Sequence, residues 1–300
     1  MKGKKKAVKT KKLHYKPKQC TPFRKDKLPY TCMSKKSLHT MAKVINKLPD
    51  ANLNLRMDDK ALYKQICEFI QSKYKCDNEG CWLTIKELMN LLDPKDLDTI
   101  KDQYRAKLPQ DLIKDYTSWL SNFDIEEVLN KHHNNIRDFK FYGATPIDFR
   151  KCSVSKKLCK LNVKQQREDG YNKLGIVFNT DESDGPGKHW MAMYVDLSGK
   201  NLEGQPGIYF FDSFGSSPMK EIKQLIKKIK NTDKGNEYVV AHNDRSIQKN
   251  TYACGFYCMH FIEHMLRGLP FKKYLRSGLN DKKMKQYINE CYLNPKEIKC

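Results

Sequence analysis

HWMAMYVDL, at residues 189–197, and IYFFD, at residues 208–212, are the two stretches that decide the fold class of this 300-residue chain. Both are short, mostly apolar runs rich in aromatic and β-branched residues, which is typical of strands inside a sheet. The ten residues between them include three glycines and a proline, which favour a turn. We therefore expect the two strands to pair as a hairpin.

The segments around this hairpin predict an α+β fold. After residue 139 short strand-like runs alternate with turns, and CGFYCMHFIEHML at 254–266 predicts a helix packed on a mostly antiparallel sheet. Between about residues 38 and 131 the signals are helical, as in LTIKELMNLLD at 83–93, where the leucines share one face. The expected parts are a basic, disordered arm (1–36), a helical N-terminal region (37–114) and a core domain (115–300).

Positive charge is concentrated at the N-terminus of a chain whose formal net charge is +22. Residues 1–36 contain fourteen lysines and arginines and a single acidic residue, Asp26. Such an arm can neutralise phosphates and release their counterions, so nucleic acid is one candidate partner. A solvated tail and a nuclear-localisation patch fit the same charge. No apolar run approaches the roughly 20 residues of a membrane-spanning helix, so we expect no membrane partner.

The eleven cysteines have an odd count and no regular spacing, and no secretion signal precedes them, which predicts free thiols in a reducing, cytosolic compartment. Cys76 and Cys81 have no histidine pair nearby, so we expect no zinc site there. HFIEH at 260–264 matches the H-x-x-E-H zinc-protease motif, but apolar residues surround it and few carboxylates follow it as a third ligand. We expect a helix surface there, and neither a metal nor another cofactor.

Cys254 is the candidate nucleophile. It opens the predicted helix 254–266, where unpaired amides and the positive end of the helix dipole favour a thiolate. Gly255 follows it, and the missing Cβ would let a substrate carbonyl approach the backbone closely. A buried structural cysteine is the alternative for any one of the eleven, so the assignment depends on the partners.

Three polar residues can complete a site around Cys254. His189 begins the first strand of the hairpin and Asp212 ends the second, so pairing would put both at one end of the sheet. Asp212 could then hold the imidazole while His189 acts as base. Gln248 and the Cys254 backbone N–H could together bind an oxyanion. His242 is a second candidate base, but it lacks a following tryptophan and a downstream aspartate.

Four blocks, in this order, resemble the adenain and ubiquitin-like-protein (SUMO) protease superfamily. They are WLSNFDIEEVL at 119–129, GKHWMAMYVDL at 187–197, IYFFDSFG at 208–215 and QKNTYACGFY at 248–257. The resemblance is nearest to the maturation proteases of large cytoplasmic DNA viruses, such as that of African swine fever virus. One departure is Ala253, because SUMO proteases usually carry Asp immediately before the nucleophile.

The resemblance implies a papain-like cysteine protease core and a catalytic role for the four residues singled out above. It also implies cleavage of viral polyprotein or virion precursor proteins after Gly-Gly or similar small residues, in the virion and at assembly sites in the host cytoplasm. Trp119 and Trp190 are candidate substrate-binding residues, because two flat indoles can form a slot that admits only chains without Cβ atoms. Core packing is the alternative for each tryptophan.

Two other functions stay open at this point. The same chemistry on isopeptide bonds would make the chain a deSUMOylase or a deubiquitinase. A degenerate, inactive core would make it a basic nucleic-acid-binding protein, although nothing about DNA binding requires an intact set of His, Asp, Gln and Cys.

Overall fold

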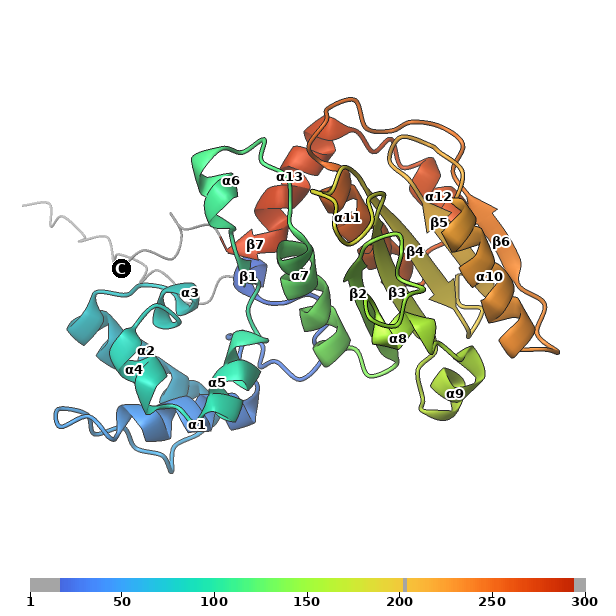
Figure 1. The fold of residues 1–300 in the computed structure, drawn as a ribbon. Coiled ribbons are helices and arrows are strands. Elements are labelled where there is room, and N and C mark those ends of the chain that lie inside the picture. The colour runs from blue at the N-terminus through green and yellow to red at the C-terminus, as the bar shows by residue number, and fades with distance from the viewer. Residues whose placement is uncertain (1–16, 202–203, 294–300) are drawn as a thin grey trace, which may run out of the picture. The chain divides into compact units, whose positions relative to one another are not determined.

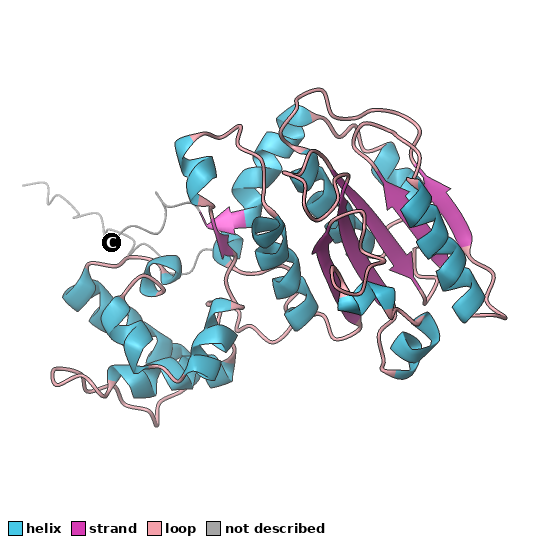
Figure 2. Ribbon diagram, viewed as in Figure 1, coloured by secondary structure: helices cyan, strands magenta, loops and turns pink. Residues whose placement is uncertain are grey.

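The computed structural model describes residues 17–201 and 204–293 of the chain. They divide into two compact units: a helical unit, which runs to Lys107 and includes Leu293, and a sheet unit, which runs from Leu108 to Tyr292. Figure 1 labels the elements of each unit, and Figure 2 distinguishes helices from strands. The division after Lys107 lies somewhat before the expected boundary at residue 114. Two short strands, β1 (Ala106–Lys107) and β7 (Tyr292–Leu293), stand where the chain passes between units.

The helical unit is built from short helices, most of which begin at a polar cap. They are the 3₁₀ helix η1 (Pro17–Gln19) and the α-helices α1 (Lys35–Ile45), α2 (Asp59–Tyr74), α3 (Glu79–Trp82), α4 (Lys86–Leu91) and α5 (Pro94–Lys101). Ser34, Asp58 and Asp93 each accept a hydrogen bond from a backbone amide in the helix that follows, which satisfies donors of the first turn. The apolar faces of these helices share one buried core.

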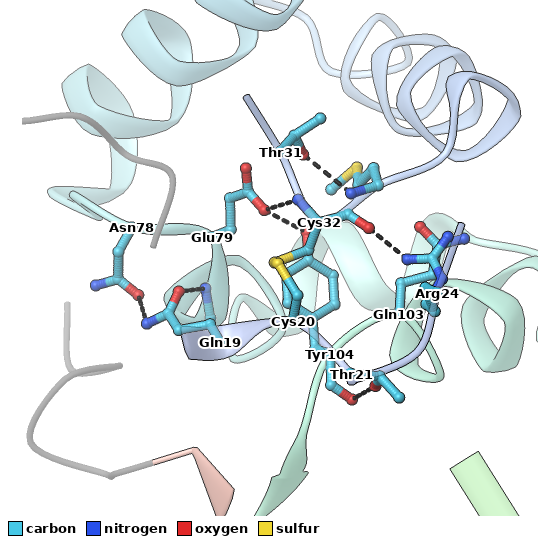
Figure 3. The surroundings of a disulfide bond; sticks show 12 residues. Gln19, Cys20, Thr21, Arg24, Thr31, Cys32, Asn78, Glu79, Gln103 and Tyr104 are labelled. Carbon is cyan, nitrogen blue, oxygen red and sulfur yellow. Dashed lines mark hydrogen bonds between the residues drawn. A yellow bond between two sulfur atoms is a disulfide. The ribbon is translucent and has the colours of Figure 1, made fainter. Parts of the chain in front are cut away.

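Residues 17–36, which we expected to belong to a disordered arm, are part of the helical unit instead. A disulfide joins Cys20 to Cys32, and both residues are buried (Figure 3). The guanidinium of Arg24 is also buried and donates to the Cys32 carbonyl and to Asp26. The lysine and proline content suggested disorder, but composition does not show that a crosslink and buried hydrogen bonds fix the segment. Residues 1–16 of the expected arm lie outside the described residues.

A mixed five-stranded sheet, in the order β2–β3–β4–β5–β6, organises the sheet unit (Figure 1). The strands are β2 (Phe139–Thr145), β3 (Lys173–Asn179), β4 (Trp190–Asp196), β5 (Gly207–Phe211) and β6 (Val239–His242). The central strands β3, β4 and β5 are antiparallel, so the predicted hairpin is present as β4 and β5. The outer pairs β2–β3 and β5–β6 are parallel, and the expectation of a mostly antiparallel sheet is corrected. Helical crossovers between those strands make the parallel pairing possible.

Successive strand residues point to opposite sides of the sheet, so both faces carry side chains that can pack against helices. Helices cover both faces of this sheet. The helices of this unit are α6 (Gln110–Lys114), α7 (Asn122–Asn135), α8 (Lys156–Cys159), α9 (Val163–Glu168), α10 (Lys220–Thr232), α11 (Cys254–Leu266), α12 (Phe271–Leu275) and α13 (Asp281–Cys291). On one face the rings of Phe211 in β5 and Phe261 in α11 stack at 5.1 Å. On the other, Ile222 and Leu225 of α10 join a core with Phe210 of β5. None of the described helices has the length and apolar character to cross a membrane.

Candidate active site

Cys254 is the first residue of α11, the helix that packs on the central strands. It is 2% exposed. The preceding residue, Ala253, is the N-cap and has no side chain that could accept from the first-turn amides. The positive end of the helix therefore lies at the sulfur, where it favours the thiolate.

Gly255 has a packing role that the sequence did not suggest. A Cβ at this position would lie 3.1 Å from Leu120 Cδ1 and 3.3 Å from Ile125 Cδ1. The missing side chain therefore lets the start of α11 pack closely against the segment that leads into α7. The expected role of the glycine in the approach of a substrate carbonyl stays a prediction.

His189 and Asp212 lie at the same end of the β4–β5 hairpin, because His189 immediately precedes β4 and Asp212 immediately follows β5. His189 Nε2 is 2.6 Å from Asp212 Oδ1, and the two side chains are 15% and 1% exposed. The Cys254 side chain lies close enough to the imidazole to help raise the pKa of His189. Since Nε2 is engaged by Asp212, Nδ1 is the ring nitrogen available to the sulfur. The structure thus brings three of the predicted residues into one chain of contacts.

These contacts set the charges of the site. Burial would lower the pKa of His189, but the hydrogen bonds to Asp212 and Cys254, with their charges, raise it to about 9. Burial would raise the pKa of Asp212, yet the hydrogen bonds from His189 and the Phe214 backbone N–H bring it below its ordinary value. At neutral pH an imidazolium therefore stands beside an ionised carboxylate.

Two residues that the sequence did not suggest support Asp212. Asn243 clamps its backbone, accepting from the Asp212 N–H at 3.0 Å and donating to the Asp212 carbonyl at 2.6 Å. The backbone N–H of Phe214 donates to Asp212 Oδ1 at 3.0 Å, and its ring lies 4.8 Å from the His189 ring. Phe214 is 42% exposed, so it covers one face of the imidazole at the surface. The turn sequence SFG after Asp212 is a signal of this arrangement.

Gln248 lies in the loop that leads to Cys254 and is 2% exposed. The Ser213 hydroxyl donates to Gln248 Oε1 at 2.7 Å, which fixes the orientation of the amide. Gln248 Nε2 donates to the Asn250 carbonyl at 2.7 Å and to Asn250 Oδ1 at 3.3 Å. Asn250 Oδ1 also accepts from the backbone amides of Tyr252 and Ala253, which closes the turn before Cys254. For Gln248 to bind an oxyanion, the longer bond to Asn250 must be exchanged for the substrate oxygen.

Comparison with known proteins identifies the family. The profile of the Ulp1 protease family, C-terminal catalytic domain, matches residues 172–299. A thiol protease of Acanthamoeba polyphaga mimivirus is 32% identical over 292 residues, which cover 91% of each chain. The chain belongs to the Ulp1 family of cysteine proteases. It is also 29% identical to a cysteine protease of African swine fever virus, over 76% of this chain and 88% of that one.

The fold of the protease is also that of a solved relative. The crystal structure of an African swine fever virus protease matches it with a TM-score of 0.67 and 20% identity, over 94% of this chain and 98% of that one. The expected α+β class, with a cysteine protease core that follows a helical N-terminal region, is confirmed. So is the prediction that the chain is a cysteine protease.

A groove of about 490 Å³ in the sheet unit is lined by both predicted substrate-binding tryptophans. Trp190 is 8% exposed and its indole N–H donates to the Leu120 carbonyl at 2.9 Å, whereas Trp119 is 51% exposed. Leu120 also lines the groove and packs against Gly255, so one wall residue contacts the first turn of α11. The last residue of β3 and the segment after it supply much of the remaining wall: Asn179, Asp181, Glu182, Ser183, Gly185, Pro186 and Gly187.

The H-x-x-E-H residues of α11 are engaged by other parts of the protease. Glu263 Oε1 lies 2.8 Å from His132 Nε2 of α7, and both side chains are buried. His264 Nε2 lies 3.4 Å from the Pro270 carbonyl, and the His260 ring packs edge-on against Tyr287. Within 17–201 and 204–293, no three potential ligands come together as a metal site would require.

The pairing of six cysteines corrects the expectation of free thiols. Disulfides join Cys20 to Cys32, Cys76 to Cys81 and Cys152 to Cys159. The described cysteines outside these disulfides are all buried: Cys67, Cys254, Cys258 and Cys291. Burial raises the pKa of Cys258 well above its ordinary value, so this thiol, one turn inside α11, is a poor nucleophile. Spacing could not reveal the pairs, because pairing depends on distance in the folded chain.

Proposed function

We propose that the protease is an endopeptidase that cleaves viral polyprotein or virion precursor chains after Gly-Gly or a similar pair of small residues. The observation that carries this proposal is the groove lined by Trp119 and Trp190, whose wall residue Leu120 packs against Gly255 of α11. The hydrogen bond from Trp190 to Leu120 holds one indole in place, so this wall resists moving aside for a side chain. A substrate segment without Cβ atoms fits such a passage.

In the proposed mechanism the Cys254 thiolate attacks the carbonyl before the scissile bond and forms a thioester. His189 gives its proton to the leaving amine, while Asp212 keeps the imidazole oriented through Nε2. The Cys254 backbone N–H and the Gln248 amide hold the oxyanion. Water then releases the acyl product, with His189 as its base.

An isopeptidase that removes a ubiquitin-like protein is the second candidate. Its support is the name of several relatives: proteins of African swine fever virus that are 28% identical to this chain are called SUMO-1 cysteine proteases. The same groove would accept the tail of a ubiquitin-like protein if that tail ended in glycines. The chemistry would be unchanged, and only the leaving amine would differ.

Cleavage of matched substrates by the intact chain and by Cys254→Ala tests the proposal. Peptides that differ only in the two residues before the cut, Gly-Gly against Gly-Ala and Ala-Ala, should show kcat/KM falling roughly 10- to 100-fold per added methyl group. Cys254→Ala should cut none of them. Equal cleavage of all peptides would contradict the slot. More efficient cleavage of a SUMO–lysine conjugate than of any peptide would favour the isopeptidase.

We place this activity in the virion and at assembly sites in the host cytoplasm, on the ground that the relatives named above are viral proteases. The basic residues 1–16 would add contact with nucleic acid, which would concentrate the enzyme near its substrates. Deleting residues 1–16 should weaken binding to duplex DNA and reduce its salt dependence, while peptide cleavage stays unchanged. If the full-length and the truncated chain bind duplex DNA with identical affinities at both of two salt concentrations, nucleic acid is removed from the proposal.

A further inference from the structure

The loop between Gln248 and Cys254 is held from two sides. On the side of β5, the Ser213 carbonyl accepts from the backbone amides of Ile247 and Gln248, and the Ser213 hydroxyl fixes the Gln248 amide. On the other side the loop meets Asp281, some thirty residues beyond it in the chain. Nothing in the motifs around Cys254 points to Asp281.

Asp281 is the first residue of α13, and its carboxylate gathers three donors. Asp281 Oδ2 accepts from the backbone amides of Lys249, at 3.2 Å, and Asn250, at 2.9 Å. Asp281 Oδ1 accepts from the Tyr257 hydroxyl at 2.8 Å. Tyr257 lies in the first turn of α11. One carboxylate therefore ties the loop and the start of α11 to the same point.

The contacts of Asp281 with the loop and with α11 affect the distance between the two oxyanion donors. One donor is the amide of Gln248, in the residue before Lys249, and the other is the backbone N–H of Cys254, at the start of α11. The spacing of the two donors depends on how the loop is set against the helix. Hydrogen bonds to an ionised acceptor are shorter and stronger than neutral ones, so the carboxylate holds that spacing firmly.

We propose that Asp281 is a positioning residue of the protease, which fixes the Gln248–Cys254 loop against α11 so that both oxyanion donors converge on one point. Asp281 touches neither substrate nor the reacting atoms, and it leaves the contacts of His189 with Asp212 and Cys254 alone. The inference rests on the proposed roles of Cys254 and Gln248. It predicts that losing the Asp281 carboxylate impairs acyl transfer while the thiolate stays reactive.

A simpler role for Asp281 would be to stabilise α13 as an acidic residue in its first turn. Asn280 is a matched control for that role, because it caps the same helix by accepting from the Lys283 backbone N–H at 3.1 Å, and its side-chain hydrogen bonds go to Gly278 and Lys283 and not to the loop. Asn280→Ala therefore weakens the start of α13 without changing the Asp281 carboxylate. Asp281→Ala removes both the acidic residue of the first turn and the acceptor that holds the loop.

The experiment compares Asp281→Ala, Asp281→Asn and Asn280→Ala by steady-state cleavage of a peptide and by the rate at which iodoacetamide alkylates Cys254. Asp281→Ala should lower kcat roughly 10- to 100-fold with KM nearly unchanged, since misplaced catalytic groups cost about this much. Its alkylation rate should stay within about twofold of the parent rate, because the His189 pair is intact. Asp281→Asn keeps one acceptor oxygen and should recover part of kcat. Asn280→Ala should keep parental kcat.

Tyr257→Phe covers the case in which Asp281→Ala fails to fold, because it removes one donor to the carboxylate and should lower kcat by about 2- to 5-fold with KM unchanged. The inference is overturned if Asp281→Ala and Tyr257→Phe lose no more kcat than Asn280→Ala, or if alkylation slows as much as cleavage. Cys254→Ala, measured in parallel, separates a failure of the inference about Asp281 from a failure of the proposed function. Residual cleavage by that variant would refute the nucleophile assignment itself.

Discussion

Each unit buries a carboxylate and surrounds it with hydrogen-bond donors, but the donors differ. In the helical unit, Glu79 accepts from the Cys32 backbone N–H at 2.9 Å and the Tyr104 hydroxyl at 3.1 Å (Figure 3). It also accepts from the Tyr63 hydroxyl at 2.7 Å. In the sheet unit, Asp212 accepts from backbone amides and from an imidazole that reaches the surface. Of these partners, only the His189 imidazole carries a positive charge at neutral pH.

The pKa values of the two carboxylates shift in opposite directions for this reason. Burial raises the pKa of Glu79, and the hydrogen bonds from Cys32 and Tyr63 offset only part of that effect. Asp212 is also buried, but the nearby His189 cation brings its pKa below the ordinary value. A buried carboxylate among neutral donors therefore holds structure together, whereas one that is paired with an imidazole can direct chemistry.

Replacing His189 should have the largest effect. His189→Ala removes the partner that distinguishes the two carboxylates, so kcat/KM should fall at least about 10⁴-fold. The matched control is His242→Ala, at an exposed histidine of β6, which should keep parental activity. Peptide cleavage and far-UV circular dichroism would be measured for both variants. An active His189→Ala with an inactive His242→Ala would reverse the assignment of the base.

Asp212→Asn should have the next largest effect, lowering kcat roughly 10²- to 10⁴-fold. It should also change the pH profile. His189 has a pKa of about 9, so in the parent kcat/KM should fall as the pH rises through that value and the imidazolium is lost. The Asp212 charge raises that pKa, so the alkaline limb should move to lower pH in Asp212→Asn. An unmoved limb would show that Asp212 does not set the charge of His189.

Glu79→Ala should act on stability, because it leaves three donors without their buried acceptor. We expect the free energy of unfolding of the helical unit to fall by about 2–4 kcal/mol. Glu79→Gln should cost less and should also flatten the pH dependence. Because the pKa of folded Glu79 is raised, the stability it contributes is present at low pH and is lost as the pH rises through that pKa.

Denaturant unfolding at pH 5 and pH 8, read from amide exchange in α2 and α3, would measure both Glu79 variants. A larger loss in Glu79→Gln than in Glu79→Ala would contradict the view that this carboxyl group serves only as an acceptor for neutral donors.

Ser213→Ala should have the smallest effect. It removes the bond that orients the Gln248 amide, so we expect kcat to fall about fivefold, as for the loss of about 1 kcal/mol. KM should stay unchanged if Gln248 binds the oxyanion. A change confined to KM, measured by steady-state kinetics, would place Gln248 in substrate binding instead.

Local patterns were enough to predict much of the sheet unit. Apolar periodicity and turn residues within short windows predict the hairpin and the helix that Cys254 opens. They also predict the helical N-terminal region, which lies outside the sheet unit. His189 and Asp212 stand at strand ends, so the pairing of two neighbouring strands was sufficient to place them together. These features depend on residues that are close in the chain, and the sequence by itself determined them.

Only the tertiary structure decided the features that join distant residues. The Cys20–Cys32 pair, the donors around Glu79, the parallel outer strands and the bond between His132 and Glu263 have no local pattern. Asp281 reaches the Gln248 loop because α13 packs on α11, and not through any motif of its own. A hydrogen bond or a disulfide requires two groups within a few ångströms, and only the packed fold sets that distance.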